Sequence, residues 1–322
     1  MNAIVVEQLG GPEVLQSKTV SDPTPGPGQI VVGVDAAGVN FMDTYQRTGL
    51  YKVDPPFTPG AEGAGIVAVI GGGVTEFKVG DRVAWCDQRG TYAEMVTINA
   101  SRAVPVPEAL ATDLAAASLL QGATAHYLVN DTFHLGADHT CLIHAAAGGV
   151  GRLLVQMAKQ AGATVVATAG GTDKVALARS AGADHVIDYK ATDFVEAVEN
   201  LLGKNKLDVV YDGVGKATFD KGMTLLRPRG LMVTYGNASG PPDAIAPLRL
   251  SQLGSLFLTR PGLVHHIATT EELRRRASDV FGSIVSGDLD VLVGLRLPIG
   301  EAAEAHRRLQ ARETTGKVLL IP

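Results

Sequence analysis

Residues 144–151, His-Ala-Ala-Ala-Gly-Gly-Val-Gly, decide the fold of this chain. They follow a short apolar run and precede a stretch whose apolar residues Leu154, Met157, Ala158 and Ala161 recur at helical spacing, with Gly162 as a stop signal. Gly148 and Gly151 occupy the second and third glycine positions of the fingerprint G-x-G-x-x-G, and Ala146 occupies the first. The loop Gly148, Gly149, Val150 and Gly151 is therefore predicted to hold a pyrophosphate at a helix N-terminus.

The sequence after this loop alternates between short β-branched runs and helical stretches. The expected strands are residues 141–145, 164–169, 185–189, 208–213, 231–236 and 255–259. This alternation is typical of a parallel sheet with helices on both faces. We therefore predict an α/β dinucleotide-binding domain, a Rossmann doubly wound sheet, over residues 121–259.

The sequence before the loop has a different pattern of residues. QIVVGVDAAGV, GAGIVAVIG, DRVAWC and TYAEMVTI are short strand-like runs separated by Gly and Pro. They predict a compact β-barrel domain over residues 1–120. Residues 260–322 read as two helices and a final strand that returns to this first domain.

Composition narrows the classes of function. A hydrophobic share of 46%, a charged share of 19% and a net charge of −5 are those of a globular enzyme without a nucleic-acid stripe. Arg274, Arg275 and Arg276 follow two glutamates and read as a solvated helix face. MNAIVVEQLG lacks signal-peptide features and no run of 18 apolar residues occurs, so we expect a cytoplasmic protein with no membrane partner. Two distant cysteines, Cys86 and Cys141, predict reduced packing residues.

The choice of dinucleotide depends on the end of the second strand of the cofactor domain. NAD-binding chains usually place an acidic residue there, whereas this chain has the neutral Thr168 and Gly170, with Lys174 just beyond. Lys174 can supply a cation to a 2′-phosphate and Tyr189 a phenolic donor. Asp173 is the competing ribose acceptor, but its place suggests a helix N-cap. The pattern favours NADPH over NADH.

Six stretches carry a resemblance over essentially the whole chain: GVNFMDTYQRTGLY (38–51), PGAEGAGIV (59–67), HAAAGGVG (144–151), VIDY (186–189), GLMVTYGNASG (230–240) and SLFLTRP (255–261). In this order they resemble the zinc-free quinone oxidoreductase branch of the medium-chain dehydrogenase/reductase family, the zeta-crystallin-like chains. The resemblance implies a GroES-like β-barrel domain joined to a Rossmann domain, and a homodimer formed through the edge strand near 255–259. An exposed apolar edge strand needs cover, which agrees with a dimer.

The resemblance also bears on metal. Where zinc-dependent relatives carry a cysteine and the histidine of GHE, this chain has Asn40 and Ala61, so no metal site is expected. Glu62 then reads as a leftover carboxylate that is hydrogen-bonded to backbone, and His144 as structural. Asn40, Tyr45 and Tyr51 are implied catalytic donors to a substrate oxygen, while Asp43 lines the pocket or orders its loop. Besides the residues above, Gln121, Thr124, Gly236, Asn237 and Arg260 match positions near the cofactor, although Arg260 also fits a salt bridge between domains.

Without a metal nothing polarises an alcohol, whereas a quinone is already electrophilic. We therefore expect an NADPH:quinone oxidoreductase that reduces small quinones by hydride or single-electron transfer. Reduction of an enoyl thioester or another activated C=C bond is an alternative, in which Tyr51 donates the proton. An NADPH-binding, crystallin-like protein with little catalysis is a third.

Overall fold

A computed structural model describes all 322 residues. The chain divides into two compact units, which we call unit 1 (Met1–Ala123 with Ile267–Pro322) and unit 2 (Thr124–His266). The boundaries expected at residues 121 and 260 lie slightly before those of these units. The first boundary falls inside the helix α2 (Thr112–Tyr127), where a sequence pattern gives no break.

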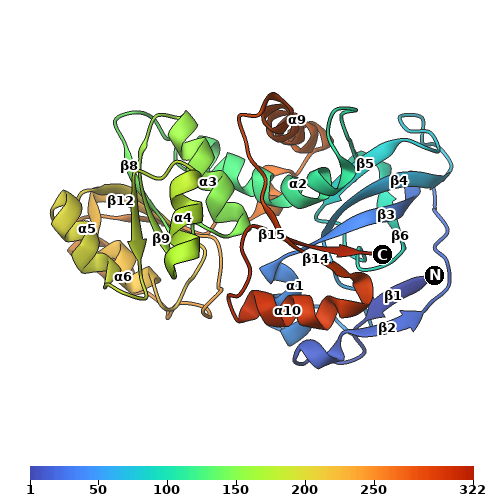
Figure 1. Cartoon of the computed structure of the whole chain (residues 1–322), viewed down its shortest axis with the longest axis horizontal. Helices are drawn as coiled ribbons and strands as arrows, with labels where there is room; N and C mark the ends of the chain where they lie inside the picture. Colours follow the sequence, from blue (N-terminus) through green and yellow to red (C-terminus); the bar gives the residue numbers. More distant parts are fainter. The chain divides into compact units, whose positions relative to one another are not determined.

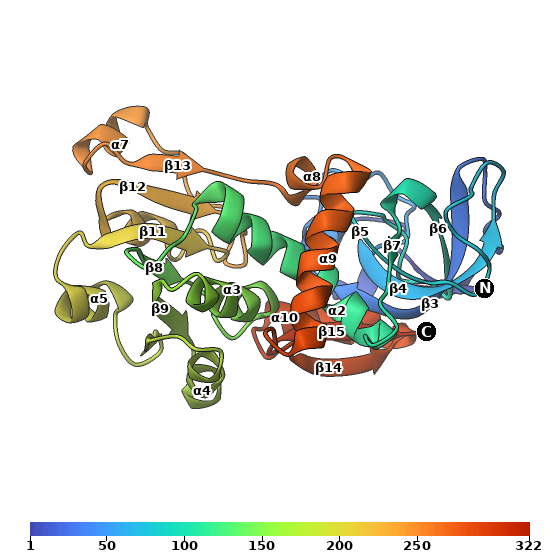
Figure 2. The same ribbon diagram turned by 90° about the horizontal axis from the view of Figure 1, so that it is seen from above.

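Unit 2 contains a fully parallel sheet of six strands in the order β10-β9-β8-β11-β12-β13. The strands are β8 (Thr140–Ile143), β9 (Thr164–Ala169), β10 (His185–Asp188), β11 (Leu207–Asp212), β12 (Leu226–Thr234) and β13 (Phe257–Thr259). This is the doubly wound order that places a nucleotide at the carboxyl ends of the strands. The predicted Rossmann domain is confirmed, and Figure 2 shows β13 beside β12 at the edge of the sheet.

Helices cover both faces of this sheet. In Figure 1 the strands lie between α3 and α4 on one side and α5 and α6 on the other. The helical elements of unit 2 are η3 (Leu128–Thr132, a π-helix), α3 (Gly149–Gln160), α4 (Thr172–Ser180), α5 (Phe194–Leu202), α6 (Phe219–Met223), α7 (Pro247–Gln252) and α8 (Leu263–His266). Leu154, Met157 and Ala158 are buried on α3, and the helix ends before Gly162, whose φ is 85°.

Unit 1 is built on a seven-stranded, mostly antiparallel sheet. Its path is β14-β15-β3-β4-β5-β7, and β6 pairs with β3. The strands are β3 (Gln29–Val39), β4 (Glu62–Ile70), β5 (Arg82–Cys86), β6 (Met95–Asn99), β7 (Val104–Pro105), β14 (Val293–Pro298) and β15 (Lys317–Ile321), and β1 (Asn2–Val5) pairs separately with β2 (Gln16–Thr19). The four strand runs expected from the sequence are all present, and β15 returns to pair with β3 as expected of the tail.

The helices of unit 1 are short except for two. They are η1 (Pro12–Val14), α1 (Phe41–Thr48), η2 (Ala100–Arg102), α9 (Thr270–Ser286), η4 (Ile299–Glu301) and α10 (Ala302–Gln310), together with most of α2. A capping box of Thr269 and Glu272 begins α9. On α10, Ala302, Ala305 and His306 are buried on one face. No helix of the structure is both long and apolar enough to cross a membrane.

Small residues let β4 lie unusually close to its neighbours. A Cβ atom on Gly65 would lie 1.9 Å from the carbonyl oxygen of Gly33 on β3. A Cβ atom on Gly63 would lie 2.7 Å from the Trp85 ring and 2.9 Å from the carbonyl oxygen of Ala36. The small residues around Glu62 are therefore required by the close pairing of β3 with β4, because backbone atoms cannot move aside as a flexible side chain can.

We predict that Gly65→Ala destabilises unit 1, because the new methyl group meets backbone rather than a movable side chain. Overpacking of this kind costs roughly 1–3 kcal/mol, and the upper end is expected here. Gly72→Ala is the matched control, since nothing lies within 4 Å of its Cβ position. Urea unfolding of both variants measures the difference, and equal midpoints for the two would contradict the packing argument.

Candidate functional site

The cofactor candidates of unit 2 gather at one edge of its sheet. His144–Gly151 follows β8, Thr168–Gly170 ends β9, and Tyr189 follows β10. Gly236 and Asn237 follow β12, and Arg260 follows β13. Because all six strands are parallel, their carboxyl ends lie at the same edge, where doubly wound sheets bind ligands.

The glycine loop opens α3 without a side-chain cap. Gly148 is the N-cap, and the first intrahelical bond runs from the Arg152 N–H to the Gly148 carbonyl at 2.9 Å. The N–H groups of Gly149, Val150 and Gly151 precede that bond and point out of the helix end. A Cβ atom on Gly151 would lie 2.3 Å from the Ala145 carbonyl oxygen. The loop therefore packs α3 closely on β8 and presents donors suited to a phosphate.

The tip of β9 is neutral. Tyr189 closes over Gly170, where a Cβ atom would lie 2.5 Å from the phenolic oxygen. Lys174 lies in the first turn of α4, and its side chain is half-buried. Gly171 is the N-cap of α4, so the expectation that Asp173 is the N-cap is wrong. Asp188 accepts bonds from the Gly171 and Lys190 N–H groups at 2.9 and 3.0 Å, and these bonds lower its pKa.

The remaining cofactor candidates, of which Gln121 belongs to unit 1 and the others to unit 2, have partly structural contacts. Arg260 donates to the Thr234 hydroxyl at 3.1 Å and to the Gly236 carbonyl at 3.2 Å, so it ties the end of β13 to the end of β12. Asn237 is buried. Gln121 and Thr124 are both buried and lie one turn apart on α2.

His144 is part of the core. Its Nδ1 lies 2.9 Å from the Thr168 hydroxyl, while its Nε2 is buried with no hydrogen-bond partner. The ring packs edge-on against Phe194 at 4.9 Å between centroids. Burial lowers the pKa of His144, which keeps the imidazole neutral. These contacts agree with the structural role expected for His144, and they show that the Thr168 hydroxyl faces this histidine.

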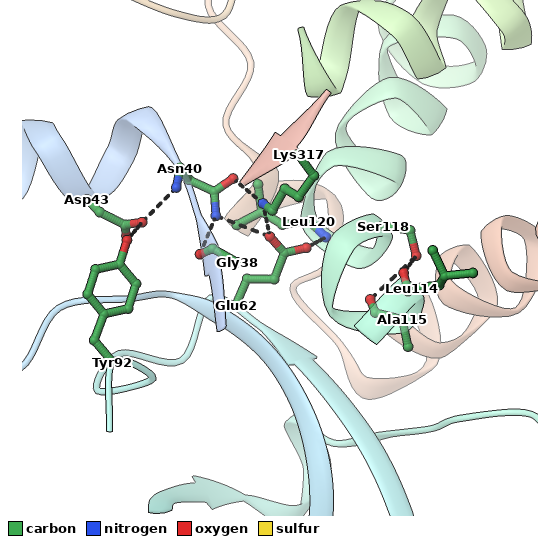
Figure 3. Close-up of polar contacts among 10 residues, drawn as sticks. All are labelled: Gly38, Asn40, Asp43, Glu62, Tyr92, Leu114, Ala115, Ser118, Leu120 and Lys317. Carbon is green, nitrogen blue, oxygen red and sulfur yellow. Dashed lines mark hydrogen bonds and ion pairs between the residues drawn. The ribbon is translucent and has the colours of Figure 1, made fainter. Parts of the chain in front are cut away.

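In unit 1 the three polar side chains of Asn40, Glu62 and Lys317 form a closed network (Figure 3). Glu62 is fully buried and forms an ion pair with Lys317 through Oε2. The Asn40 Nδ2 donates to that same oxygen at 3.1 Å, and the Leu120 N–H donates to Oε1 at 2.6 Å. The expectation that Glu62 is a leftover carboxylate is therefore wrong, although the backbone partner expected for it is present.

This network fixes how Asn40 can act. Its Oδ1 accepts from Lys317 at 2.9 Å, and its Nδ2 donates to Glu62 and, at 3.3 Å, to the Gly38 carbonyl. An amide has only two N–H donors, so both are used inside the protein. Asn40 thus orients its surroundings, whereas its predicted donation to a substrate oxygen would require one of these bonds to break.

A second buried chain of polar groups begins at Asp43. Its Oδ2 accepts from the Asn40 N–H at 2.8 Å and from the Tyr92 hydroxyl at 2.9 Å. Tyr92 contacts His306 Nε2 at 3.2 Å, and Arg47 contacts His306 Nδ1 at 3.2 Å. Because arginine only donates, Nδ1 accepts and Nε2 carries the proton. The bonds therefore run in one direction from Arg47 through His306 and Tyr92 to Asp43, and Asp43 orders the start of α1.

Burial shifts the pKa of two titratable groups in this chain, Asp43 at its end and His306 within it. Burial raises the pKa of Asp43 to about 7, against the lowering effect of its bonds from Asn40 and Tyr92. Burial, with the charge of Arg47, lowers the pKa of His306 to about 3. Asp43 therefore titrates near neutrality while His306 stays neutral.

Tyr45 and Tyr51 lie together. Their ring centroids are 5.1 Å apart in an edge-to-face arrangement, and the Tyr51 N–H donates to the Tyr45 carbonyl at 3.0 Å. Tyr45 is buried on α1, whereas the Tyr51 side chain is 39% exposed. The structure thus brings these two predicted donors together just after Asn40 in the chain.

Sequence reasoning missed Lys317, Tyr92 and His306. Lys317 opens the final strand run KVLLIP, where a lone lysine reads as a solvated strand end. The available signal was Glu62: a carboxylate among small residues is buried, and a buried charge needs a partner. His306 lies at helical spacing from Ala302, which indicates a buried histidine.

Comparison with known proteins gives two family matches. The family model of the alcohol dehydrogenase GroES-like domain matches residues 26–108, and that of the zinc-binding dehydrogenase matches residues 149–279. A protein of Pseudomonas aeruginosa named quinone oxidoreductase is 42% identical over 97% of this chain and 97% of its own length. A 2-haloacrylate reductase of a Burkholderia species is 39% identical over 99% of this chain and 98% of its own length.

A solved structure is similar over the whole chain. The Escherichia coli quinone oxidoreductase complexed with NADPH has a TM-score of 0.97 and 41% identity, and the match covers 100% of both chains.

One of the matching models is named for zinc, but the residues of this chain do not fit that ion. No group of three His, Cys, Asp or Glu side chains is placed to hold a metal. The Glu62 carboxylate is neutralised by Lys317, and burial beside Glu62 raises the pKa of the neighbouring Cys86 far above its usual range. A zinc site needs at least three such protein ligands close together, and Glu62, already paired with Lys317, belongs to no such group.

We predict that Asp43 and His306 change the free energy of unfolding with pH in opposite directions. Between about pH 4 and 6.5 the folded chain holds a proton on Asp43 and none on His306, whereas the unfolded chain holds the reverse. The stabilisation that protonated Asp43 gives the folded chain is complete below pH 4 and is lost as the pH rises to about 7. The stabilisation that neutral His306 gives is complete above pH 6.5 and is lost as the pH falls to about 3. The two effects offset each other in the wild-type chain.

Single substitutions separate the two effects. In Asp43→Asn only the effect of His306 remains, so the free energy of unfolding rises with pH between about pH 4 and 6.5. In His306→Gln only the effect of Asp43 remains, so it falls with pH over the same range. Each slope is at most about 1.4 kcal/mol per pH unit. Urea midpoints at several pH values measure them, with the double variant as the control that returns to the wild-type dependence. Parallel curves for both single variants and the wild type would rule out the offset.

Proposed function

This chain belongs to the quinone oxidoreductase family, and we propose that it reduces small quinones with NADPH without zinc. The sequence identity to proteins of that name, over nearly the full length, supports the quinone and the enzyme class. The proposal that the reaction needs no zinc rests on the pairing of Glu62 with Lys317, which leaves no set of metal ligands.

NADPH is the cofactor, and unit 2 holds it. The relative solved with NADPH supports this choice, and the neutral tip of β9 supports it independently. The N–H groups of Gly149, Val150 and Gly151 bind the pyrophosphate, and Lys174 with Tyr189 binds the 2′-phosphate. Gln121, Thr124, Gly236 and Asn237 contact the rest of the cofactor, while Thr168, Gly170 and Arg260 support the strand ends through the bonds and close contacts described above.

The start of α1 in unit 1 holds the quinone. NADPH supplies a hydride, or its electrons one at a time, and the overall reaction adds that hydride and one proton to the quinone to give a hydroquinone. Negative charge develops on the quinone oxygen, and the hydroxyl groups of Tyr45 and Tyr51 donate to it. Asn40 acts with them by fixing the start of α1, because its own amide is bonded internally.

The first test is turnover by protein whose metal content has been measured. We expect chelator-treated protein to oxidise NADPH with 1,4-benzoquinone and 9,10-phenanthrenequinone at an undiminished rate, and to leave simple alcohols unchanged. Stopped-flow absorbance of NADPH measures the rate. One tightly held zinc per chain together with alcohol oxidation would overturn the proposal.

Lys174→Gln should weaken the binding of NADPH and leave that of NADH unchanged. A charge-assisted bond to phosphate contributes about 1.5–3 kcal/mol, which is roughly ten- to a hundredfold in Kd. Lys206→Gln is the control, since this exposed lysine lies in the loop before β11, at the opposite end of that strand from the proposed site. Fluorescence titration gives both dissociation constants, and an equal loss for the two dinucleotides would remove Lys174 from the phosphate site.

A second candidate function is the reduction of an activated C=C bond. The similarity to a 2-haloacrylate reductase favours it. In that case Tyr51, which is partly exposed and can exchange its proton with water, is the proton donor. Enoyl thioesters or haloacrylates that turn over faster than quinones, with loss of that activity in Tyr51→Phe, would favour this candidate. Tight NADPH binding without any turnover would favour a binding protein.

A homodimer through β13 completes the proposal. β13 is an edge strand, and Phe257 on it is 60% exposed. An open apolar edge is covered when a second copy pairs with it across a two-fold axis. Sedimentation of a monomer at micromolar concentration would contradict this.

A further inference from the structure

Lys317 is a buried cation that the proposed reaction does not yet use. It is the first residue of β15, and its side chain is 1% exposed. β15 pairs antiparallel with β3 in the register Val318 to Val39, so Lys317 comes opposite Asn40. A residue distant in sequence is thus brought directly to the start of α1.

The contacts of Lys317 determine the orientation of Asn40. An ammonium group only donates and a carboxylate only accepts, so the Asn40 Oδ1 must face Lys317 and its Nδ2 must face Glu62. Space for the pair depends on Gly38, where a Cβ atom would lie 2.6 Å from the Glu62 Oε2 and 2.7 Å from the Lys317 Cε. Figure 3 shows the Asn40 amide between the two charged groups, so removing either charge takes away a partner that fixes the direction of the amide.

Stability alone does not explain this ion pair. Removing two charges from water costs about as much as their attraction returns, and an uncharged pair of similar size is often equally stable. What the charged pair provides is a single arrangement of Asn40, whose N–H also bonds to Asp43. Asn40 therefore connects the two buried networks at the point where α1 begins, five positions before Tyr45.

We propose that Lys317 is a positioning residue for hydride acceptance, acting through Asn40 to fix the start of α1 and the hydroxyl of Tyr45. This inference rests on the proposed quinone reduction. Lys317 itself is not required to touch the substrate or NADPH. Its effect on turnover is therefore separable from its effect on folding and on cofactor binding.

The test is a cycle of Glu62→Gln, Lys317→Met and the double variant, with thermal midpoint, NADPH Kd and quinone kcat measured for each. Each single variant leaves one buried charge without its partner, so both should lose stability. The double variant should regain most of that stability and bind NADPH within about twofold of wild type. Its kcat should stay about ten- to a hundredfold low, since small displacements of positioned groups cost this much.

Two further variants make the outcome specific. Asn40→Ala should lower kcat by a similar factor and should add little to the loss in the double variant, because residues in one network are not additive. Lys159→Met is the control, since it breaks a half-exposed pair with Asp184 in unit 2 and should leave kcat unchanged.

Recovery of both stability and kcat in the double variant would show that the pair is only structural and overturn the inference. A loss of NADPH binding equal to the loss of kcat would also overturn it. Additive losses for Asn40→Ala would show that Lys317 does not act through Asn40. A wild-type chain without quinone turnover is a different result, because it removes the proposed function while the stability cycle remains measurable.

Discussion

In unit 1 a fully buried carboxylate must be neutralised, and this requirement fixes the side chains around it. Glu62 begins β4 and is fully buried, so its charge needs both a cation and N–H donors. Lys317 of β15 gives the cation, and Asn40 and α2 give the N–H groups. One side chain therefore ties together two strands, the start of α1 and the middle of α2.

The buried polar networks also limit the size of the side chains around them. Gly38 leaves room for the ion pair, and Gly60 lies against Tyr92, which bonds to Asp43. Packing, charge pairing and the orientation of Asn40 therefore depend on one another at this site. Chemistry that needs only alignment and hydrogen bonds, as quinone reduction does, suits such a site.

The fold could be predicted largely from the sequence, because its signals are local. The loop around Gly148 and Gly151 and the alternation of strands and helices specify unit 2 through short-range patterns. The Glu62 partner could not be predicted, since Lys317 is 255 positions away and only the β15–β3 register brings it close. The direction of the Asn40 amide was missed for the same reason: its donors are assigned by neighbours from another strand.

The discontinuity of unit 1 has a consequence for synthesis on the ribosome. All of unit 2, Thr124–His266, is translated before β14, α10 and β15 exist. Unit 2 has a complete sheet by then and can fold as a nascent domain. Unit 1 must wait with Glu62 unpaired and the β3 edge open until Lys317 leaves the exit tunnel, so the interval between the two events is when the nascent chain most needs protection from aggregation.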